Sequence, residues 1–287
     1  MKFYSPLRYP GGKNRLSKFI GKICKENNIK GHYVEPYAGG AAVALFLLFE
    51  GYVTKITIND NDKSIYAFWY SVLNNTDRLC KLIKNTEINV DTWYKYKKIQ
   101  LKKEDTSLID LGFSTLFLNR TNHSGIINGG VIGGLKQNGN NKMNCRFDKE
   151  ELIKKIKLIA KHKNNIEIYK LDALKLIKKI QKESQKTSTI FYFDPPYYLK
   201  GESLYMNFYE HDDHVRVSEE IKKIKNQLWI VSYDNNKQIK KMYKGFKKIE
   251  YQLFHSAHHA KKSSEVIFFS KNLIVPKVIS PTNIIYQ

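Results

Sequence analysis

The sequence predicts an α/β fold, a doubly wound, mostly parallel sheet of seven strands with an inserted, mainly helical lobe. Seven short segments are rich in Ile, Val, Tyr or Phe and are bounded by polar or turn residues, as is typical of strands. Most are separated by stretches with apolar residues three and four positions apart, which indicates helices. This alternation favours a parallel sheet covered on both faces. The predicted strands are residues 32–37, 53–60, 165–170, 188–194, 227–233, 247–254 and 264–270.

The composition is globular, with a strong excess of positive charge. In 287 residues, 49 Lys and Arg stand against 27 Asp and Glu, a net charge of +22. This excess indicates a polyanionic partner, either nucleic acid or an anionic membrane. The longest apolar run, residues 41–49, is too short to span a membrane, and the N-terminus lacks the apolar core of a signal peptide. Three widely spaced cysteines without a CxxC pair argue against a zinc site or a disulfide framework and favour a reducing cytoplasm.

The first candidate site is the segment RYPGGK, residues 8–13, which precedes a predicted helix over 14–26. A lysine close to a helix N-terminus can bind an anion, so Lys13 is a candidate ligand. The alternative is a simple capping turn.

The strand 32–37 leads into Gly39 and Gly40 and then into an apolar helix. Glycines here allow a sharp turn and close approach of a ligand at the carboxyl edge of the sheet, although an ordinary strand–turn–helix joint can contain them as well. Asp60 ends the next strand, where an acid usually holds the hydroxyl pair of a nucleotide ribose. Alone, Asp60 would more often cap the helix over 63–73. Together these features favour an adenosine-containing ligand, and the lack of GxxxxGK[ST] argues against a nucleoside triphosphate.

Between Asp60 and about Ile166 the alternation of strands and helices stops. Helical patterns cover residues 64–84, 108–118 and 149–162, and a Gly- and Asn-rich stretch occupies 119–147. An interval of this length predicts an inserted lobe rather than a loop.

After the third strand, helices are predicted over 172–184 and 217–225. The last two strands follow each other with only a loop between them. We therefore expect them to form an antiparallel pair at one edge of the sheet.

The fourth strand ends abruptly in Asp194-Pro195-Pro196-Tyr197. The first proline holds Asp194 in extended geometry, and both prolines lack an N–H while keeping their carbonyl oxygens as acceptors. A carboxylate, a fixed carbonyl and an aromatic face suit a flat ligand with an exocyclic amino group, with Tyr197 stacking on the ring. Enzymes that act on bases in duplex DNA flip the target into such a pocket. Local packing of the tyrosines is the alternative, and Tyr198 is left open between lining the pocket and packing beneath it.

Taken in chain order, these segments resemble the motifs of the Dam-like DNA adenine-N6 methyltransferases, which use S-adenosylmethionine. The resemblance covers nearly the whole chain and rests on RYPGGK, VEPYAGGAA, IND, LFLNRTNHSG, CRF, DPPY and VSYDN. DPPY is shared with other amino-group methylases, whereas RYPGGK and FLNRT narrow the match. The chain departs from the family at Tyr37, Ala41 and the NHSG segment, so no target sequence is transferred.

The resemblance implies a Rossmann-like, S-adenosylmethionine-binding catalytic domain formed by residues 1–60 and 165–287, and a target-recognition insertion at 61–164. It implies S-adenosylhomocysteine as product and no metal. Asp172 would meet the adenine amino group of the cofactor, or would simply cap the helix over 173–183. The implied catalytic residues are Asp194, Pro195, Pro196 and Tyr197. The implied cofactor-binding residues are Tyr9, Gly12, Lys13, Glu35, Pro36, Tyr37, Gly39, Gly40, Asp60, Asp172 and Asp194.

DNA contacts are expected from the inserted lobe and from the loop 255–264, which is otherwise a solvated basic loop. Their side chains suit phosphates and base edges. The glycine-rich part of the lobe is expected to be a β-hairpin or a loop that orders on DNA, with a plain surface loop as the alternative. The candidate DNA-binding residues are Arg120, Asn122, Ser124, Lys136, Gln137, Asn138, Arg146, Lys261 and Lys262.

The expected function is methylation of a flipped adenine at N6 in a specific duplex DNA sequence, within a restriction–modification system or by a solitary methylase. The alternatives are transfer to cytosine N4, RNA adenine or a protein amide, and a non-catalytic DNA-binding relative. The expected partners are double-stranded DNA and a cognate restriction endonuclease acting separately, with no membrane. We expect a monomer, or a dimer on DNA, in the prokaryotic cytoplasm and associated with the nucleoid.

Overall fold

The computed structural model describes residues 2–8, 13–183, 188–198, 209–253, 263–278 and 280–282. Seven strands form one sheet within these ranges, and each corresponds to a predicted strand. They are β1 His32–Glu35, β2 Lys55–Asn59, β3 Ile166–Tyr169, β4 Thr189–Phe193, β5 Leu228–Asp234, β6 Lys247–Leu253 and β7 Ser263–Phe269.

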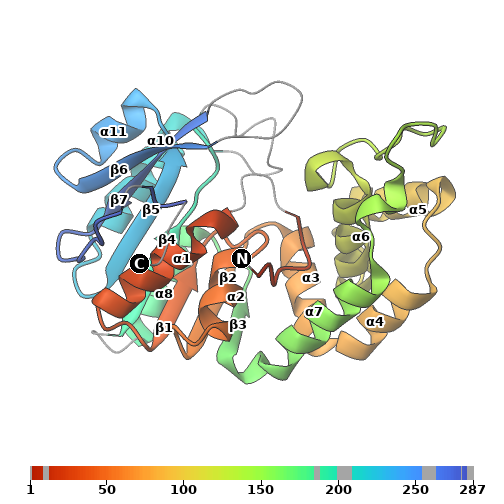
Figure 1. The fold of residues 1–287 in the computed structure, drawn as a ribbon, viewed down its shortest axis with the longest axis horizontal. Helices are drawn as coiled ribbons and strands as arrows, with labels where there is room; N and C mark the ends of the chain where they lie inside the picture. The colour runs from red at the N-terminus through yellow and green to blue at the C-terminus, as the bar shows by residue number, and fades with distance from the viewer. Residues whose placement is uncertain are drawn as a thin grey trace.

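The sheet order is β3-β2-β1-β4-β5-β7-β6 (Figure 1). The first five strands along the chain run parallel, and β7 pairs antiparallel with both β5 and β6, as predicted for the last two strands. The chain moves outward from β1 through β2 to β3 and then returns to β4 on the other side of β1. This reversal between β1 and β4 is a topological switch point, where ligands bind at the carboxyl ends of the strands.

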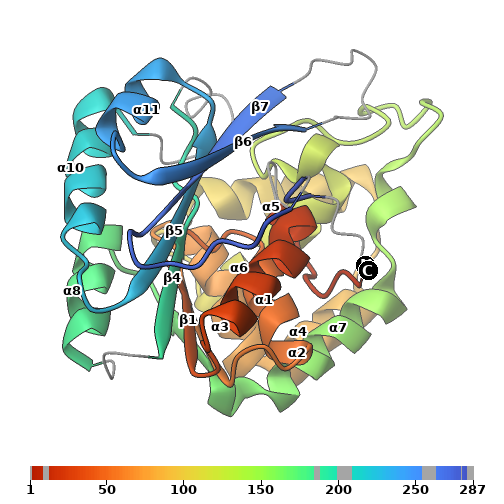
Figure 2. The same ribbon diagram turned by 60° about the vertical axis from the view of Figure 1, so that its left-hand side comes forward.

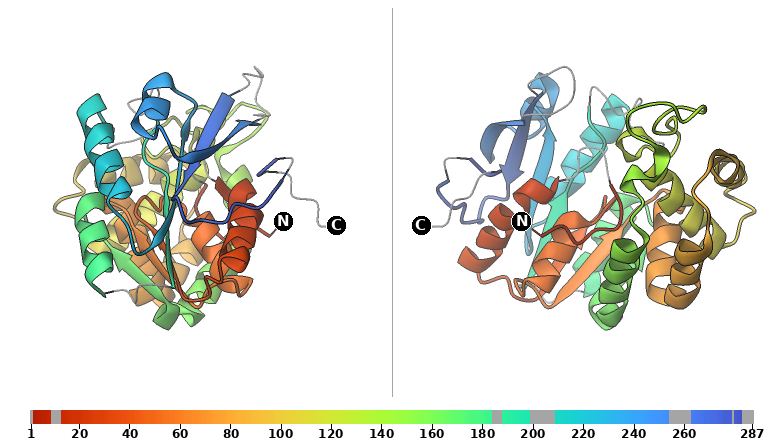
Figure 3. Two further views of the ribbon diagram at one scale, coloured as in Figure 1. Left: turned by 90° about the vertical axis from the view of Figure 1, so that its left-hand side faces the viewer. Right: turned by 45° about the vertical axis from the view of Figure 1, so that its right-hand side comes forward.

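Helices cover both faces of the sheet (Figures 2 and 3). Strand side chains alternate between the two layers, because successive residues of a strand point to opposite faces. Tyr33 and Ile190 pack in the layer with the first three helices, while Val34 and Phe191 pack in the opposite layer. The first layer holds α1 Ser17–Glu26, α2 Ala42–Phe49 and α3 Lys63–Asn74, and the second holds α8 Ala173–Glu183, α10 His211–Lys222 and α11 Lys237–Met242.

The interval between β2 and β3 forms a helical lobe beside the sheet (Figures 1 and 3). The helix predicted over 64–84 is two separate helices with a break at Asn75. The sequence pattern also failed to predict the helix α5 over Val90–Leu101 and the helix α11. The remaining helices of the lobe are α4 Thr76–Asn85, α5 Val90–Leu101, α6 Leu108–Thr121 and α7 Lys149–Lys161. The described residues also form the short 3-10 helices η1 Lys13–Leu16, η2 His123–Gly125, η3 Met143–Arg146 and η4 Lys163–Asn165.

The lobe and the sheet share one continuous hydrophobic cluster, which contains Phe68, Phe113 and Ile156 of the lobe together with Tyr33 and Ile190 of the sheet. The two parts are therefore packed on each other through apolar side chains rather than joined by a linker. Among the described residues, no helix is long and apolar enough to cross a membrane.

Candidate active site

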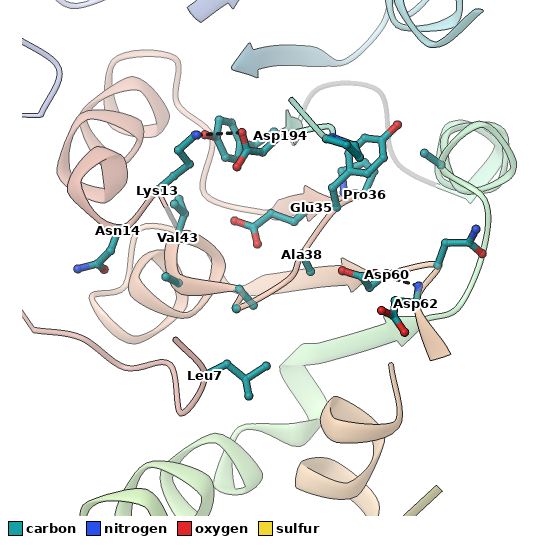
Figure 4. A pocket seen from close by; sticks show the side chains of 18 of the residues that line it. Leu7, Lys13, Asn14, Glu35, Pro36, Ala38, Val43, Asp60, Asp62 and Asp194 are labelled. Atoms are coloured by element: carbon teal, nitrogen blue, oxygen red, sulfur yellow. Dashed lines mark hydrogen bonds and ion pairs between the residues drawn. The ribbon is translucent and has the colours of Figure 1, made fainter. Parts of the chain in front are cut away.

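A cavity of about 390 Å³ lies at the carboxyl edge of the sheet, at the switch point between β1 and β4 (Figure 4). Its wall is formed by the residues that follow β1, β2, β3 and β4, by Leu7 and Arg8 of the N-terminal segment, and by Ser124 of the lobe. Segments far apart in the sequence thus meet around one space. The predicted site residues that line it are Lys13, Glu35, Pro36, Tyr37, Gly40, Asp60, Ser124, Asp172, Asp194 and Pro196.

The turn after β1 brings backbone groups close to the cavity. Gly39 and Ala41 have φ values of 45° and 46°, in the left-handed region that favours glycine. Ala41 therefore adopts a backbone conformation that is more costly for alanine than for glycine. Glu35 lies buried beneath the turn, and its Oε1 accepts hydrogen bonds from the Tyr33 hydroxyl at 2.8 Å and the Ala44 N–H at 3.1 Å. Burial raises the pKa of Glu35 to about 8 despite these two bonds.

Asp60 faces this turn from the end of β2. Its Oδ2 accepts from the Gly39 N–H at 2.9 Å, and its Oδ1 accepts from the Asp62 N–H at 3.0 Å. Burial, with the nearby Asp62 carboxylate, raises the pKa of Asp60 to about 7. The cap of α3 is Asp62, which accepts from the Ser64 N–H at 2.8 Å. Asp60 is therefore not the N-cap of α3, and its side chain lines the cavity instead.

Asp172 fits both alternatives that the sequence left open, a residue of the binding site and a cap of the following helix. It lines the cavity, and its Oδ1 accepts from the Leu174 N–H at 2.9 Å at the start of α8. Sequence reasoning missed the neighbouring Asn59, whose buried amide holds the loops after β1 and β3 together. Its Nδ2 donates to the carbonyls of Pro36 and Leu171, both at 2.9 Å, so it sets the width of this end of the cavity.

Asp194 lies at the end of β4 and is held by one of its two carboxylate oxygens. Its Oδ1 accepts from the Ser232 hydroxyl of β5 at 2.7 Å and lies 3.3 Å from the Lys13 Nζ (Figure 4). Burial raises the pKa of Asp194 to about 6, while the Lys13 charge acts in the opposite direction. Sequence reasoning missed Ser232, which lies in the VSYDN motif without a role having been assigned to it.

The three residues after Asp194 differ in whether they line the cavity. Pro195 is buried, Pro196 lines the cavity, and Tyr197 does not line it. The Tyr197 hydroxyl instead donates to Glu265 Oε1 at 2.6 Å and accepts from Lys13 Nζ at 3.1 Å. Tyr198 does not line the cavity either and packs against the hydrophobic cluster of the second layer. Its N–H donates to Asp234 Oδ1 at 2.8 Å, and its hydroxyl forms a hydrogen bond with His211 Nδ1 at 2.8 Å.

A comparison with the sequence models of known families shows which family the chain belongs to. The sequence model of the D12 class N6 adenine-specific DNA methyltransferases matches residues 9–256, which is most of the chain. The chain belongs to this family. Its reaction is therefore methylation of adenine N6 in DNA, and the predicted family, fold class and reaction are confirmed.

Two further proteins are similar to this methyltransferase. The type II methyltransferase M.MjaIII of Methanocaldococcus jannaschii is 25% identical over 262 residues, which cover 84% of this chain and 88% of that protein. The crystal structure of a SAM-dependent methyltransferase from Agrobacterium tumefaciens is 9% identical, with a TM-score of 0.41, and the match covers 88% of this chain and 60% of that one.

Two of the residues predicted to bind DNA have structural roles in the methyltransferase. Asn122 is fully buried, and its amide donates to the carbonyls of Ile126 and Ile127, both at 2.9 Å, and accepts from Trp93 Nε1 at 2.6 Å. The prediction that it contacts DNA is wrong, because its hydrogen-bonding groups are used inside the lobe. Arg120 donates from Nε to the Pro6 carbonyl at 2.7 Å, so its guanidinium ties the N-terminal segment to α6.

The other predicted DNA contacts of the lobe are exposed. Ser124 lies at the cavity, Lys136 and Asn138 lie in the glycine-rich loop, and Arg146 ends η3. The loop is not a hairpin: its one bridge joins Val131 to Asn122, and turns follow. Gln137 also serves the loop itself, because its side chain bonds three backbone groups of the loop. Tyr9, Gly12, Lys261 and Lys262 lie outside the described residues.

Proposed function

We propose that this adenine methyltransferase binds S-adenosylmethionine in the cavity between β1 and β4 and receives there an adenine flipped out of duplex DNA. The donor set of the cavity fits such a cofactor. A bent glycine turn allows close backbone approach, and the carboxylates of Glu35, Asp60 and Asp172 can accept from hydroxyl and amino groups. A volume of about 390 Å³ lies within the usual range of small-molecule sites.

Each acid of the cavity has a proposed role. Asp60 follows β2 beside the glycine turn, so it would accept from the ribose hydroxyl pair. Asp172 lies at the far end, where its carboxylate would accept from the cofactor's adenine amino group. Glu35 at the end of β1, which Pro36 and Tyr37 follow, and Lys13 of η1 would lie toward the methionine end. The Glu35 carboxyl group would accept a hydrogen bond from the methionine amino group, and Lys13, which Asp194 and Glu265 hold, would border this end.

The chemistry requires positioning and electrostatics rather than a covalent intermediate. S-adenosylmethionine supplies the methyl group as an electrophilic sulfonium substituent. Asp194 and the Pro195 carbonyl would accept one hydrogen bond each from the two N6 hydrogens of adenine. This pairing draws the nitrogen lone pair out of the ring and aims it at the methyl group. The Asp194 carboxylate would also be a base for the proton that N6 loses after transfer.

The helical lobe is the proposed DNA-recognition element. We assign residues 61–164 to recognition, and 1–60 with 165–287 to catalysis, because Ser124 and Arg8 bring the lobe and the N-terminal segment to the mouth of the same cavity. Tyr197, which is anchored by Glu265 and Lys13 and does not line the cavity, would stack on the flipped base where the adenine meets Asp194. The product would be S-adenosylhomocysteine. The enzyme would act as a monomer in the cytoplasm, where a cognate endonuclease would cut the same sequence separately.

The single observation that carries the proposal is Asp194, held by Ser232 and Lys13 at the edge of a cavity rich in acids. The test incubates the purified full chain with labelled S-adenosylmethionine and mixed-sequence duplex DNA, followed by digestion to nucleosides. We expect the label in N6-methyl-2′-deoxyadenosine. Label in N4-methylcytosine, or cofactor binding without any transfer, would overturn the proposal, and the same DNA without enzyme is the control.

A further inference from the structure

A buried ion cluster adjoins Asp194 at the wall of the cavity. The Lys13 side chain is only 5% exposed, and its Nζ lies 2.9 Å from Glu265 Oε1 and 3.3 Å from Asp194 Oδ1. Glu265, at 2% side-chain exposure, is almost completely buried. One buried ammonium thus bridges two carboxylates, one from β4 and one from β7. Such a group is stable only when its partners hold it in place.

Glu265 holds more than the lysine. Its Oε1 also accepts from the Tyr197 hydroxyl at 2.6 Å, and its Oε2 accepts from the hydroxyl of Tyr251, which lies directly opposite on β6. Burial raises the pKa of Glu265, but Lys13 and the two hydroxyl groups outweigh burial, so its pKa lies below the usual value. Glu265 is therefore a charged anchor shared by η1, the DPPY segment and the antiparallel edge of the sheet.

This anchor has a consequence for Asp194. Lys13 and Ser232 both reach Oδ1, and within the described part of the chain no hydrogen bond reaches Oδ2. The shorter contact of Lys13 is with Glu265, so the ammonium is held back from Asp194. If Glu265 carried no charge, Lys13 would be attracted to Asp194 alone and would compete with the substrate amino group for the carboxylate.

We propose that Glu265 is a positioning residue for methyl transfer, which holds Lys13 and Tyr197 so that Asp194 keeps one oxygen for the adenine amino group. The inference rests on the proposed role of Asp194. A residue at the start of β7 would thus take part in the transfer step rather than in cofactor binding. Glu265 itself touches no substrate, because it does not line the cavity.

The test compares wild type, Glu265→Gln and Glu265→Asp in single-turnover methylation, with cofactor affinity measured separately by calorimetry. We expect Glu265→Gln to lower the transfer rate by about 100-fold, in the range of a lost electrostatic positioning group. Cofactor affinity should stay within about threefold, and Glu265→Asp should restore part of the rate because it restores the charge. The matched control is Glu250→Gln, an equal change at an exposed glutamate of β6 outside the cluster.

A double-mutant cycle with Lys13→Met separates positioning from a general effect on the fold. If Glu265 acts through Lys13, the loss from Glu265→Gln shrinks when Lys13 is absent. A rate within threefold of wild type for Glu265→Gln, or a full additive loss in the Lys13→Met background, would overturn the proposal. Should Glu265→Gln not fold, Tyr251→Phe decides, since it removes one bond to Glu265 and keeps the charge. A rate reduced about threefold or more supports the anchor, and an unchanged rate overturns it. Failure of wild type to methylate adenine would instead refute the proposed function.

Discussion

At the scale of single residues, Asp194 combines a fixed orientation with a charge that is kept near neutral pH. Two donors hold Oδ1, and the pKa of about 6 leaves the carboxylate ionised above that pH. An ionised carboxylate is the better acceptor for the amino hydrogens of adenine. The transfer rate should therefore fall as the pH drops below about 6, because Asp194 is then protonated.

Removing the Asp194 carboxylate should separate binding from chemistry. We expect Asp194→Ala to reduce single-turnover methylation by about 1,000-fold or more, because an acceptor of the reacting amino group is lost. Equilibrium binding of S-adenosylmethionine should change by only a few fold. Asp105→Ala, at an exposed position of the lobe, is the control for loss of an acid. A mutant with near-normal turnover would refute the role assigned to Asp194.

Asp60 predicts a pH dependence of cofactor binding. Its pKa is raised to about 7, so the folded protein without ligand binds a proton there at pH 5.5 and loses it by about pH 8. The ionised form accepts ribose hydroxyls better. We therefore expect affinity for S-adenosylmethionine to increase by about tenfold from pH 5.5 to 7.5, equivalent to roughly one pKa unit of coupling. Calorimetry on Asp60→Asn should show a flatter profile, and an equally steep one would contradict the assignment.

Sequence patterns located the acids that follow strands, but they did not reveal the charged cluster beside Asp194. Asp60 and Asp194 could be predicted because strand ends at the carboxyl edge converge. Glu265 lies near the start of the predicted strand 264–270 and was given no role, whereas in the structure it lies on the same face as buried Ile267 and Phe269. Only the pairing of β7 with β5 and β6 brings it to Lys13, 252 positions away in the chain.

At the scale of elements, the crossing of α3 and α6 determines how the lobe sits on the sheet. A Cβ added at Gly112 of α6 would lie 2.5 Å from the Ala67 carbonyl oxygen of α3. The two helices are therefore in backbone contact, and only glycine allows this distance. Patterns of hydrophobic residues predicted both helices but not this contact, because a glycine inside a helix gives no periodic signal.

Gly112→Ala should destabilise the fold. The two helices would have to separate, at a cost of about 1–3 kcal/mol, of which alanine's better helix propensity returns up to about 1 kcal/mol. Denaturant unfolding should show a midpoint below wild type. Gly130→Ala in the same lobe is the control, because its added Cβ would meet nothing within 4 Å. Equal unfolding free energies for the two variants would argue against close packing of α3 and α6.

The same scale explains where the helix predictions failed. One continuous pattern over 64–84 hid the break at Asn75, since apolar residues continue in helical spacing on both sides of it. α5 buries only Trp93, Tyr96 and Gln100, and its aliphatic residues lie at its two ends, so its sequence carries little helical periodicity. Tertiary contacts with α6 stabilise it instead, through hydrogen bonds from Gln100 Nε2 to Ser114 and Thr115, both at 3.1 Å.

At the scale of the whole molecule, the net charge of +22 favours DNA binding most where its positive side chains lie close to the cavity. The N-terminal segment links the parts, since Asn119 of α6 bonds both the N–H and the carbonyl of Arg8. Arg8 lines the cavity, and Arg146 lies near enough to lower its pKa further, after burial. Positive side chains thus gather at the mouth of the cavity, where the phosphates that flank a flipped base would lie.

This distribution predicts which lysines and arginines bind DNA. Arg146→Ala and Lys136→Ala should each weaken DNA binding and reduce the slope of log affinity against log salt by about 1, as expected for one lost phosphate contact. Lys271→Ala removes the same charge just after the end of β7. Because β7 runs antiparallel to β5, this end lies at the amino edge of the parallel strands, opposite the edge that carries the cavity. Fluorescence anisotropy at three salt concentrations measures all three slopes. If Lys271→Ala reduced the slope as much as Arg146→Ala, DNA binding would depend on total charge rather than on the mouth of the cavity. We expect instead that only the two lobe variants change it, because counterions are released where the protein meets the phosphates.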